Sequence, residues 1–188
     1  MKRAIACIFP ILLSACATTS PNVPASGYLC CNMRTDGSWI SDSNYAESGK
    51  YIIPAGTPVK YLGSGRYRVY IEVEGKKQAI GNDYSRDLSM DAFANRYIVT
   101  KDPRPQIALL PPHIRTAIET ARVTKGMTRD QVLVAIGYPI SNETPHLDST
   151  FWKYWLWSFS PILIKFNESN TVTQVETDSE TLQNIFLE

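Results

Sequence analysis

Residues that could carry acid–base, nucleophilic or metal chemistry are few in this chain of 188 residues. It contains two histidines, His113 and His146, and four cysteines. His146 lies close to Asp148 and Ser149, but a catalytic triad needs groups that the fold brings together, and local spacing does not supply this. Two separated histidines without a cysteine cluster do not make a zinc site. We therefore expect a protein that is not an enzyme and needs no metal or cofactor.

Two polar segments and the charge balance argue against a serine nucleophile, an EF-hand cation site and nucleic-acid binding. Leu62-Gly63-Ser64-Gly65 lacks the Gly-x-Ser-x-Gly spacing of a nucleophile elbow, so a turn is expected there. Residues 82–87 (NDYSRD) offer oxygen ligands for a cation without EF-hand spacing, which favours an ordinary loop. With 19 basic and 18 acidic residues, the chain lacks the positive charge that neutralises nucleic-acid phosphates. We expect no nucleic-acid partner, and no small-molecule substrate is evident.

The clearest chemical signal is Cys16, which ends an N-terminal apolar segment. Lys2 and Arg3 precede the apolar run of residues 4–13, and small residues follow it. This pattern is typical of a secretory signal peptide, and the run is too short for a membrane-spanning helix. Leu13-Ser14-Ala15-Cys16 resembles the lipobox of bacterial lipoproteins, in which the peptide is cut before the cysteine and the sulfur receives diacylglycerol.

This resemblance implies that residues 1–15 are removed and that Cys16 carries the lipid. Two or more acyl chains then give stable attachment to a bilayer. Ala17 stands where an aspartate usually retains such proteins in the inner membrane, which favours the outer membrane. Residues 16–27 are polar and contain proline, as expected of a flexible tether. The alternative is a soluble secreted protein in which Cys16 is unmodified.

Cys30 and Cys31 are the two cysteines that remain in the folded part. Adjacent residues of a strand point to opposite faces. We interpret this pair as two half-buried thiols in a β segment, with a vicinal or intermolecular disulfide as the alternative.

Residues 28–100 have the pattern of a small β-rich domain. Apolar and polar side chains alternate along residues 67–73, as expected of a strand with one buried face. Asp36-Gly37 is a turn sequence. Several short strands joined by tight turns predict a small β-barrel-like domain, of which an SH3-like barrel is one form. Ser89 predicts the N-cap of a short helix that ends at Tyr97.

The second half of the chain is predicted to be an α+β domain over residues 112–188, after a proline-rich linker at residues 101–111. Thr128 and Gln131 have the spacing of a capping box at the start of a helix. Gly137 predicts the end of that helix. Three antiparallel strands follow, over residues 151–160, 162–166 and 171–177.

Three short motifs in this half resemble the signature of the BamE (SmpA/OmlA) family of outer-membrane lipoproteins. They are Gly126-Met127-Thr128, Gln131-Val132 and Gly137-Tyr138-Pro139, and the aromatic segment 152–155 follows them. The resemblance covers residues 112–177. It implies a two-helix, three-stranded antiparallel fold and a non-catalytic role in support of the machine that inserts β-barrels into the outer membrane.

The segment 151–160 is aromatic or apolar on both faces. Phe151, Trp155 and Phe159 alternate with Trp152 and Tyr154, and two helices cover only one face of such a sheet. The second face is covered by the N-terminal β-domain, or docks a partner protein, or inserts at a membrane interface. We take the following residues as the candidate partner surface: Trp152, Tyr154, Trp155, Leu156 and Trp157.

The sequence therefore predicts a lipid-anchored, periplasm-facing interaction protein of the outer membrane that supports envelope assembly. Its expected partner is an envelope protein, with the β-barrel assembly machine as the first candidate. One alternative is a module that binds peptidoglycan or another envelope glycan, with stacking surfaces at Tyr45, Tyr51, Tyr61 and Tyr67. Another is a periplasmic enzyme inhibitor, because the BamE fold resembles that of a β-lactamase-inhibitor protein.

Overall fold

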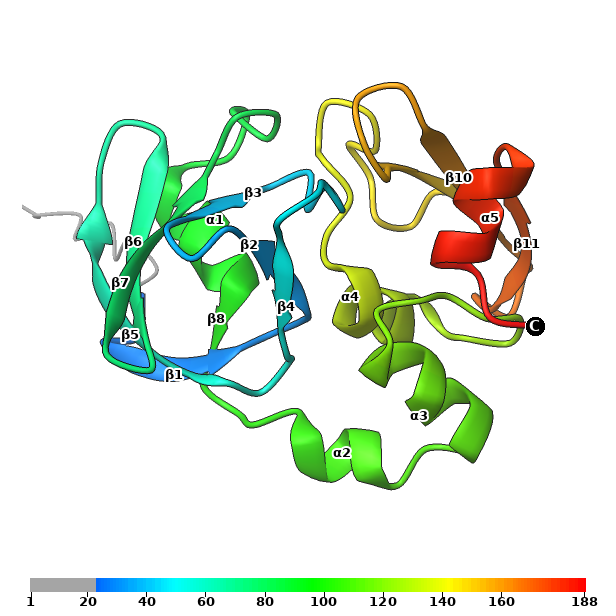
Figure 1. The fold of residues 1–188 in the computed structure, drawn as a ribbon, viewed down its shortest axis with the longest axis horizontal. Coiled ribbons are helices and arrows are strands. Elements are labelled where there is room, and N and C mark those ends of the chain that lie inside the picture. The colour runs from blue at the N-terminus through cyan, green and yellow to red at the C-terminus, as the bar shows by residue number, and fades with distance from the viewer. Residues whose placement is uncertain (1–22) are drawn as a thin grey trace, which may run out of the picture.

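The computed structural model describes residues 23–188, which form two lobes side by side (Figure 1). The N-terminal lobe is a curled eight-stranded sheet around one helix, and the C-terminal lobe packs a three-stranded sheet against helices. The predicted signal peptide at residues 1–15, the lipid-attachment residue Cys16 and most of the predicted tether lie outside the described residues.

The N-terminal lobe consists of many short strands. Its elements are β1 (Ser26–Leu29), β2 (Met33–Thr35), β3 (Trp39–Ser41), β4 (Tyr51–Ile53), β5 (Pro58–Ser64), β6 (Arg68–Val73), β7 (Lys76–Gly81), α1 (Met90–Tyr97) and β8 (Ile98–Val99). The strand order is β4-β2-β3-β7-β6-β5-β1-β8, and the β3–β7 pair is parallel while all the others are antiparallel. The sheet curls into an open half-barrel with β4 and β8 at its edges.

The core of this lobe lies between β6 and α1. Apolar and polar side chains alternate along β6, and a cap at Ser89 fixes the start of α1. Val69 and Ile71 are fully buried and point into the curl. Helix α1 begins at Ser89, whose hydroxyl accepts a hydrogen bond from the Ala92 N–H at 3.2 Å, and it places Phe93 and Tyr97 against the sheet. The predicted strand and the predicted helix start are both confirmed. Full burial of a side chain as large as Phe93 is worth about 3 kcal/mol.

The C-terminal lobe follows a connection that contains a short helix. The helix of the connection is α2 (Arg104–Ala108). The elements of the lobe are α3 (Pro112–Glu119), α4 (Arg129–Ile136), β9 (Phe151–Trp155), β10 (Pro161–Phe166), β11 (Val172–Glu176) and α5 (Ser179–Ile185). Helix α2 lies within the segment predicted as a linker. The three strands are antiparallel in the order β11-β10-β9.

Helix α4 begins with the capping box that the sequence predicts. The Thr128 hydroxyl accepts a hydrogen bond from the Gln131 N–H at 3.3 Å, and the Gln131 side-chain oxygen accepts one from the Thr128 N–H at 2.9 Å. The helix ends at Gly137, whose φ of 85° lies in the left-handed region that favours glycine. These local predictions are confirmed.

The predicted fold class is wrong. A small barrel-like, SH3-like domain followed by a two-helix, three-stranded BamE-like domain was expected. The structure is mostly sheet, with an eight-stranded open sheet, a three-stranded sheet and, over residues 23–188, five short helices. In the C-terminal lobe α5 follows the strands, and its Ile185 packs into the same core as α3 and α4.

Two local causes explain this error. Strands β2, β3 and β4 have three residues each, too few to display an alternation pattern in the sequence. Helix α5 depends on a cap rather than on apolar periodicity, because the Asp178 carboxylate accepts hydrogen bonds from the N–H and the hydroxyl of Thr181 at 2.9 and 2.6 Å.

Hydrogen bonds join the two lobes directly. The Asn44 side-chain N–H₂ donates to the Ile136 carbonyl at 2.9 Å, and the Ala46 N–H donates to the Leu156 carbonyl at 2.7 Å. The Asp87 carboxylate accepts a hydrogen bond from the Ser141 hydroxyl. Side chains and loops of the half-barrel therefore position the end of α4 and the end of β9.

Candidate functional site

The three-stranded sheet buries one face and leaves the other largely open. Its inner face packs on α3, α4 and α5. Its outer face brings Phe151 opposite Lys165, Lys153 opposite Leu163, and Trp155 opposite Pro161. This grid follows from the alternation of the strands, because residues two apart share one face. We call it the outer face.

Ion pairs neutralise the charges on the outer face. Lys153 pairs with Glu143 at 2.7 Å, and Lys165 pairs with Glu176 at 2.6 Å. The Lys153 ammonium also lies 4.6 Å from the centroid of the Trp155 ring. The outer face is therefore apolar and aromatic with compensated charge, as is typical of the surfaces at which proteins contact each other.

The loop between β9 and β10 adds an exposed aromatic ring beside this face. The Leu156 N–H donates to the Ser160 carbonyl, and the Ser160 N–H donates to the Trp157 carbonyl, both at 3.0 Å, which closes a tight loop. Phe159 at its tip is 91% exposed. A groove of about 500 Å³ lies next to it, lined by Lys153, Phe159, Pro161, Ile162, Leu163, Glu176, Thr177 and Asp178.

The structure separates the residues predicted as a partner surface. Trp152, Tyr154 and Leu156 are buried in the core against the helices. The Trp152 indole N–H donates to the Leu147 carbonyl at 3.2 Å, and the Tyr154 hydroxyl donates to the Gly137 carbonyl at 3.0 Å. Burial raises the pKa of Tyr154, so its hydroxyl stays a donor.

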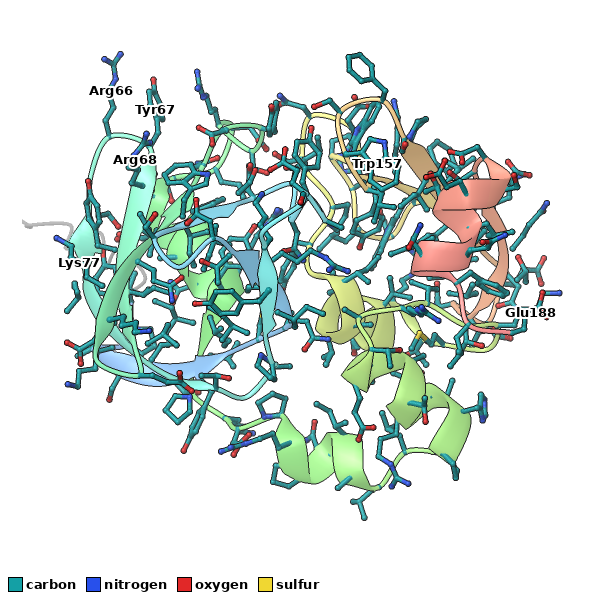
Figure 2. The ribbon with its side chains drawn as sticks, viewed as in Figure 1. Arg66, Tyr67, Arg68, Lys77, Trp157 and Glu188 are labelled. Atoms are coloured by element: carbon teal, nitrogen blue, oxygen red, sulfur yellow. A yellow bond between two sulfur atoms is a disulfide. The ribbon has the colours of Figure 1, made fainter. Side chains whose placement is uncertain are left out.

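Only two of the five predicted residues are half-buried and close to the surface. Trp155 lies on the outer face, and Trp157 is in the loop before Phe159 (Figure 2). Two exposed aromatic residues, Phe151 and Phe159, were not in the predicted set. The sequence carries one signal for Phe159, which is a phenylalanine between two serines directly before a proline, in a segment expected to turn.

The four tyrosines considered for glycan stacking are spread over the N-terminal lobe. Tyr45 lies beside Tyr84, with 6.5 Å between the ring centroids. Tyr61 shares a hydrogen bond with the Ser64 hydroxyl, and Tyr51, which is 50% exposed, is on the edge strand β4. No ring of the four contacts another among the aromatic pairs of residues 23–188. They do not form one stacking platform.

His146, Asp148 and Ser149 lie at a turn, whereas Leu62, Gly63 and Ser64 are the last residues of strand β5 rather than the expected turn. The Ser149 N–H donates to the His146 carbonyl at 3.2 Å, and no hydrogen bond joins the side chains of His146, Asp148 and Ser149 within the described chain. Leu62-Gly63-Ser64-Gly65 lies at the β5–β6 hairpin. In residues 23–188, no group of three or more His, Cys, Asp or Glu side chains is placed to hold a metal ion.

Two buried acceptors lie where strands β3 and β7 end. Ser41 and Gly81 are paired in register in these parallel strands, and Asp42 and Asn82 follow them. One carboxylate oxygen of Asp42 and the side-chain oxygen of Asn82 are buried without a hydrogen-bond partner in the described part of the chain. Burial raises the pKa of Asp42, and hydrogen bonds from the Tyr84 N–H and the Ser85 hydroxyl oppose that effect.

Cys30 and Cys31 form a disulfide with each other. The interpretation as two thiols is therefore replaced by its alternative, the vicinal disulfide. Cys31 is fully buried in the core of the half-barrel, and Cys30 packs against the same core. The pair precedes Asn32 at the boundary between the lobes.

Comparisons with known proteins do not assign a family. No protein-family model, no curated protein and no solved structure matches this chain. Among the helices of residues 23–188, none has the length and apolarity that a bilayer crossing requires.

Proposed function

We propose that this chain is a lipid-anchored, periplasm-facing interaction protein of the outer membrane. In this proposal Cys16 carries the lipid, the following segment gives reach, and the outer face binds an envelope protein. The lipobox-like sequence that ends at Cys16 supports the anchor. The β-barrel assembly machine was suggested as partner by the BamE resemblance, and it loses that support because the fold is not BamE-like.

One observation supports the outer face as a binding surface for another protein. Phe159 is 91% exposed beside a groove of about 500 Å³ on a face where ion pairs neutralise the lysines. An exposed aromatic ring next to an apolar groove with a charged rim has the features of a binding hot spot. The glycan-binding alternative lacks a common stacking platform. The inhibitor alternative depended on the BamE fold and loses that basis.

Crosslinking in cells tests the docking surface. A photoreactive amino acid at position 159 of the full-length chain should capture one envelope protein. The matched control is position 109, because Leu109 is also an exposed apolar residue, at 85%, but belongs to the region of α2. A Phe151→Ser, Phe159→Ser double variant should lose binding of the captured protein without a change in melting temperature. Equal capture at positions 159 and 109, or none at 159, would contradict the proposal.

Metabolic labelling tests the anchor separately. Radioactive palmitate should mark the wild-type protein, and a Cys16→Ser variant should remain unlabelled and lose its stable attachment to membranes. Wild-type protein without label would exclude a lipid anchor at this residue, whatever crosslinking shows.

A further inference from the structure

Exposed cations stacked on aromatic rings form a ridge at one end of the molecule. Figure 2 shows Arg66, Tyr67, Arg68 and Lys77 along the outer edge of the N-terminal lobe. We call this the basic ridge and define it by Arg66, Arg68, Lys77 and Arg86 with the rings of Trp39, Tyr67 and Tyr70.

Cations already occupy the aromatic rings of the basic ridge. Tyr67 has the Arg66 and Arg86 guanidinium carbons 5.1 and 4.5 Å from its ring centroid. The Arg68 guanidinium carbon lies 4.4 Å from the Trp39 ring. Stacked guanidinium groups keep their N–H donors free at the edge, where they can bind carboxylates. The ridge therefore suits an acidic partner better than a sugar that needs an open ring face.

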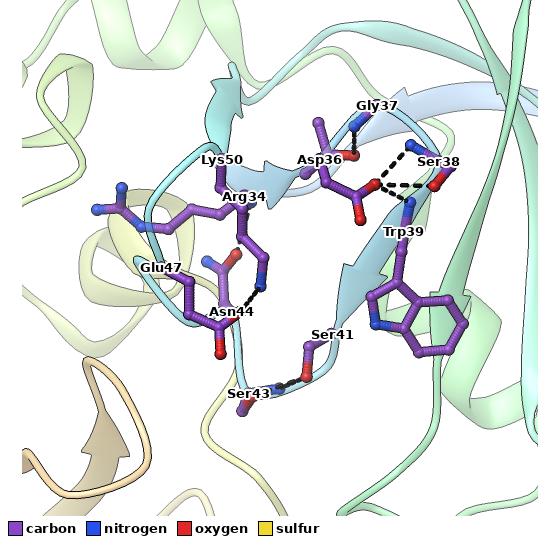
Figure 3. A network of polar contacts seen from close by, with 11 residues as sticks. Arg34, Asp36, Gly37, Ser38, Trp39, Ser41, Ser43, Asn44, Glu47 and Lys50 are labelled. Atoms are coloured by element: carbon purple, nitrogen blue, oxygen red, sulfur yellow. Dashed lines mark hydrogen bonds and ion pairs between the residues drawn. The ribbon is translucent and has the colours of Figure 1, made fainter.

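A structured turn and a glycine hold Trp39 in the ridge. The Asp36 carboxylate accepts hydrogen bonds from the N–H groups of Ser38 and Trp39, both at 2.8 Å (Figure 3). The Trp39 ring lies so close to Gly81 that a Cβ there would collide with it. The ring and the Arg68 guanidinium above it are therefore pre-positioned on the surface.

The cations of the ridge lack intramolecular carboxylate partners in the described chain. None of Arg66, Arg68, Lys77 and Arg86 forms an ion pair within residues 23–188. The nearby Glu72 on β6 is taken by Lys60, at 2.6 Å. The Asp83 carboxylate lies near the Trp39 ring but forms no ion pair in the part of the chain that the structure describes, so these four cations are available to bind an external carboxylate.

The opposite end of the molecule presents acidic groups. Residues 168–188 contain five acidic residues and no basic one. Glu176 is paired with Lys165 and Asp178 caps α5 beside the Phe159 groove, whereas Glu180 and Glu188 are exposed and form no ion pair in the described chain. Helix α5 and the C-terminus lie at the far end of the long axis from the β6–β7 strands (Figure 1).

We infer that the acidic C-terminal end of one copy of this chain binds the basic ridge of a second copy. This goes beyond the proposed docking function, which uses the outer face. The two surfaces differ and lie at opposite ends, so the contact is head-to-tail and builds open chains of molecules rather than closed dimers. Arginine, tryptophan and tyrosine are the residue types that anchor such contacts.

Crosslinking from the ridge tests this inference in the full-length chain. A photoreactive amino acid at position 67 should give a covalent dimer, with the crosslink in residues 168–188 of the other copy. Position 51 is the matched control, because Tyr51 is exposed on the same sheet but outside the ridge. Absence of a dimer, attachment outside residues 168–188, or capture of a different acidic protein instead would overturn the inference.

Complementary charge reversal provides the second test. Arg66→Glu with Arg68→Glu should lower dimer capture about tenfold, and Glu180→Lys with Glu188→Lys should do the same. Cells that hold both variants together should regain capture, because each reversed surface then meets its complement. Melting temperatures should stay at the wild-type value, since these side chains are exposed. Failure of the mixed cells to regain dimer capture would overturn the inference. Crosslinking from position 159 tests the proposed docking function separately, and the charge reversals should leave it unchanged.

Discussion

The side-chain N–H₂ of Asn32 donates a hydrogen bond to the Ala135 carbonyl at 2.9 Å, across the boundary between the lobes. The same nitrogen donates to the Ile118 carbonyl at 2.6 Å, and the Asn32 side-chain oxygen accepts from the Ala55 N–H at 2.9 Å. Ala135 and Ile118 lie in the last turns of α4 and α3, and the Ile118 carbonyl also accepts a hydrogen bond from the Ala121 N–H at 3.0 Å. One buried amide from the half-barrel therefore caps two helices of the other lobe.

Asn32→Ala should lower the free energy of unfolding by about 3 kcal/mol, because it leaves buried backbone groups without partners. Urea denaturation measures this loss. Asn142→Ala is the matched control, since the Asn142 side chain is exposed, and its effect should stay within about 0.5 kcal/mol. Equal effects of the two substitutions would show that Asn32 does not support the junction.

Trp152→Ala and Phe159→Ala should separate the core of the C-terminal lobe from its surface. Trp152 is 1% exposed and packs edge-on against Phe166, so its truncation should cost about 4 kcal/mol. Phe159 is exposed, and its truncation should change stability by less than about 0.5 kcal/mol while it weakens partner capture. Thermal and urea unfolding of the two variants check this. A large loss of stability in Phe159→Ala would place that ring in the core.

Local signals in the sequence predicted individual helices and strands, and they predicted which residues share one face of a strand. They did not predict which strands pair with each other. Alternation in residues 151–160 groups Trp152 with Tyr154 correctly. It does not say which face the helices cover, because that depends on contacts between distant segments. The parallel pairing of β3 with β7 is likewise a long-range contact between strands that are far apart in the sequence.

The candidate site was predictable only in part for the same reason. Trp155 was included, whereas Phe151 and Phe159 were left out, because exposure follows from the packing of the whole lobe rather than from residue type. The basic ridge was not predictable, since Arg86 and Trp39 reach Tyr67 and Arg68 only through the curl of the sheet.

Thr128→Ala should lower the free energy of unfolding by about 1 kcal/mol through loss of the α4 cap. The Thr128 hydroxyl satisfies the Gln131 N–H, which has no other partner in the first turn. Thr128→Ser should retain most of the stability, because serine supplies the same acceptor. Urea denaturation of both variants tests this, and equal losses for alanine and serine would show that the methyl group rather than the cap stabilises the helix start.

Asp42→Asn should stabilise the protein at neutral pH by about 1–2 kcal/mol. The neutral amide removes the cost of burying a carboxylate with one unpartnered oxygen, and its oxygen can still accept from the Tyr84 N–H, which now bonds Asp42 at 2.9 Å. An exposed control, Asp148→Asn, should have little effect. A lower stability of Asp42→Asn would mean that the native carboxylate is bound by a group that asparagine cannot replace.

The pH dependence of this effect has a definite sign. Burial raises the folded-state pKa of Asp42, the Asp83 carboxylate adds to the rise, and hydrogen bonds from Tyr84 and Ser85 only partly offset it. The folded protein therefore binds the Asp42 proton more tightly than the unfolded chain does. Protonation of Asp42 therefore stabilises the folded protein. This stabilisation is complete below the ordinary aspartate pKa and is lost as the pH rises through the raised pKa of the folded state. Urea denaturation at a series of pH values should show that the advantage of Asp42→Asn over wild type grows across this window, and a constant difference would contradict the raised pKa.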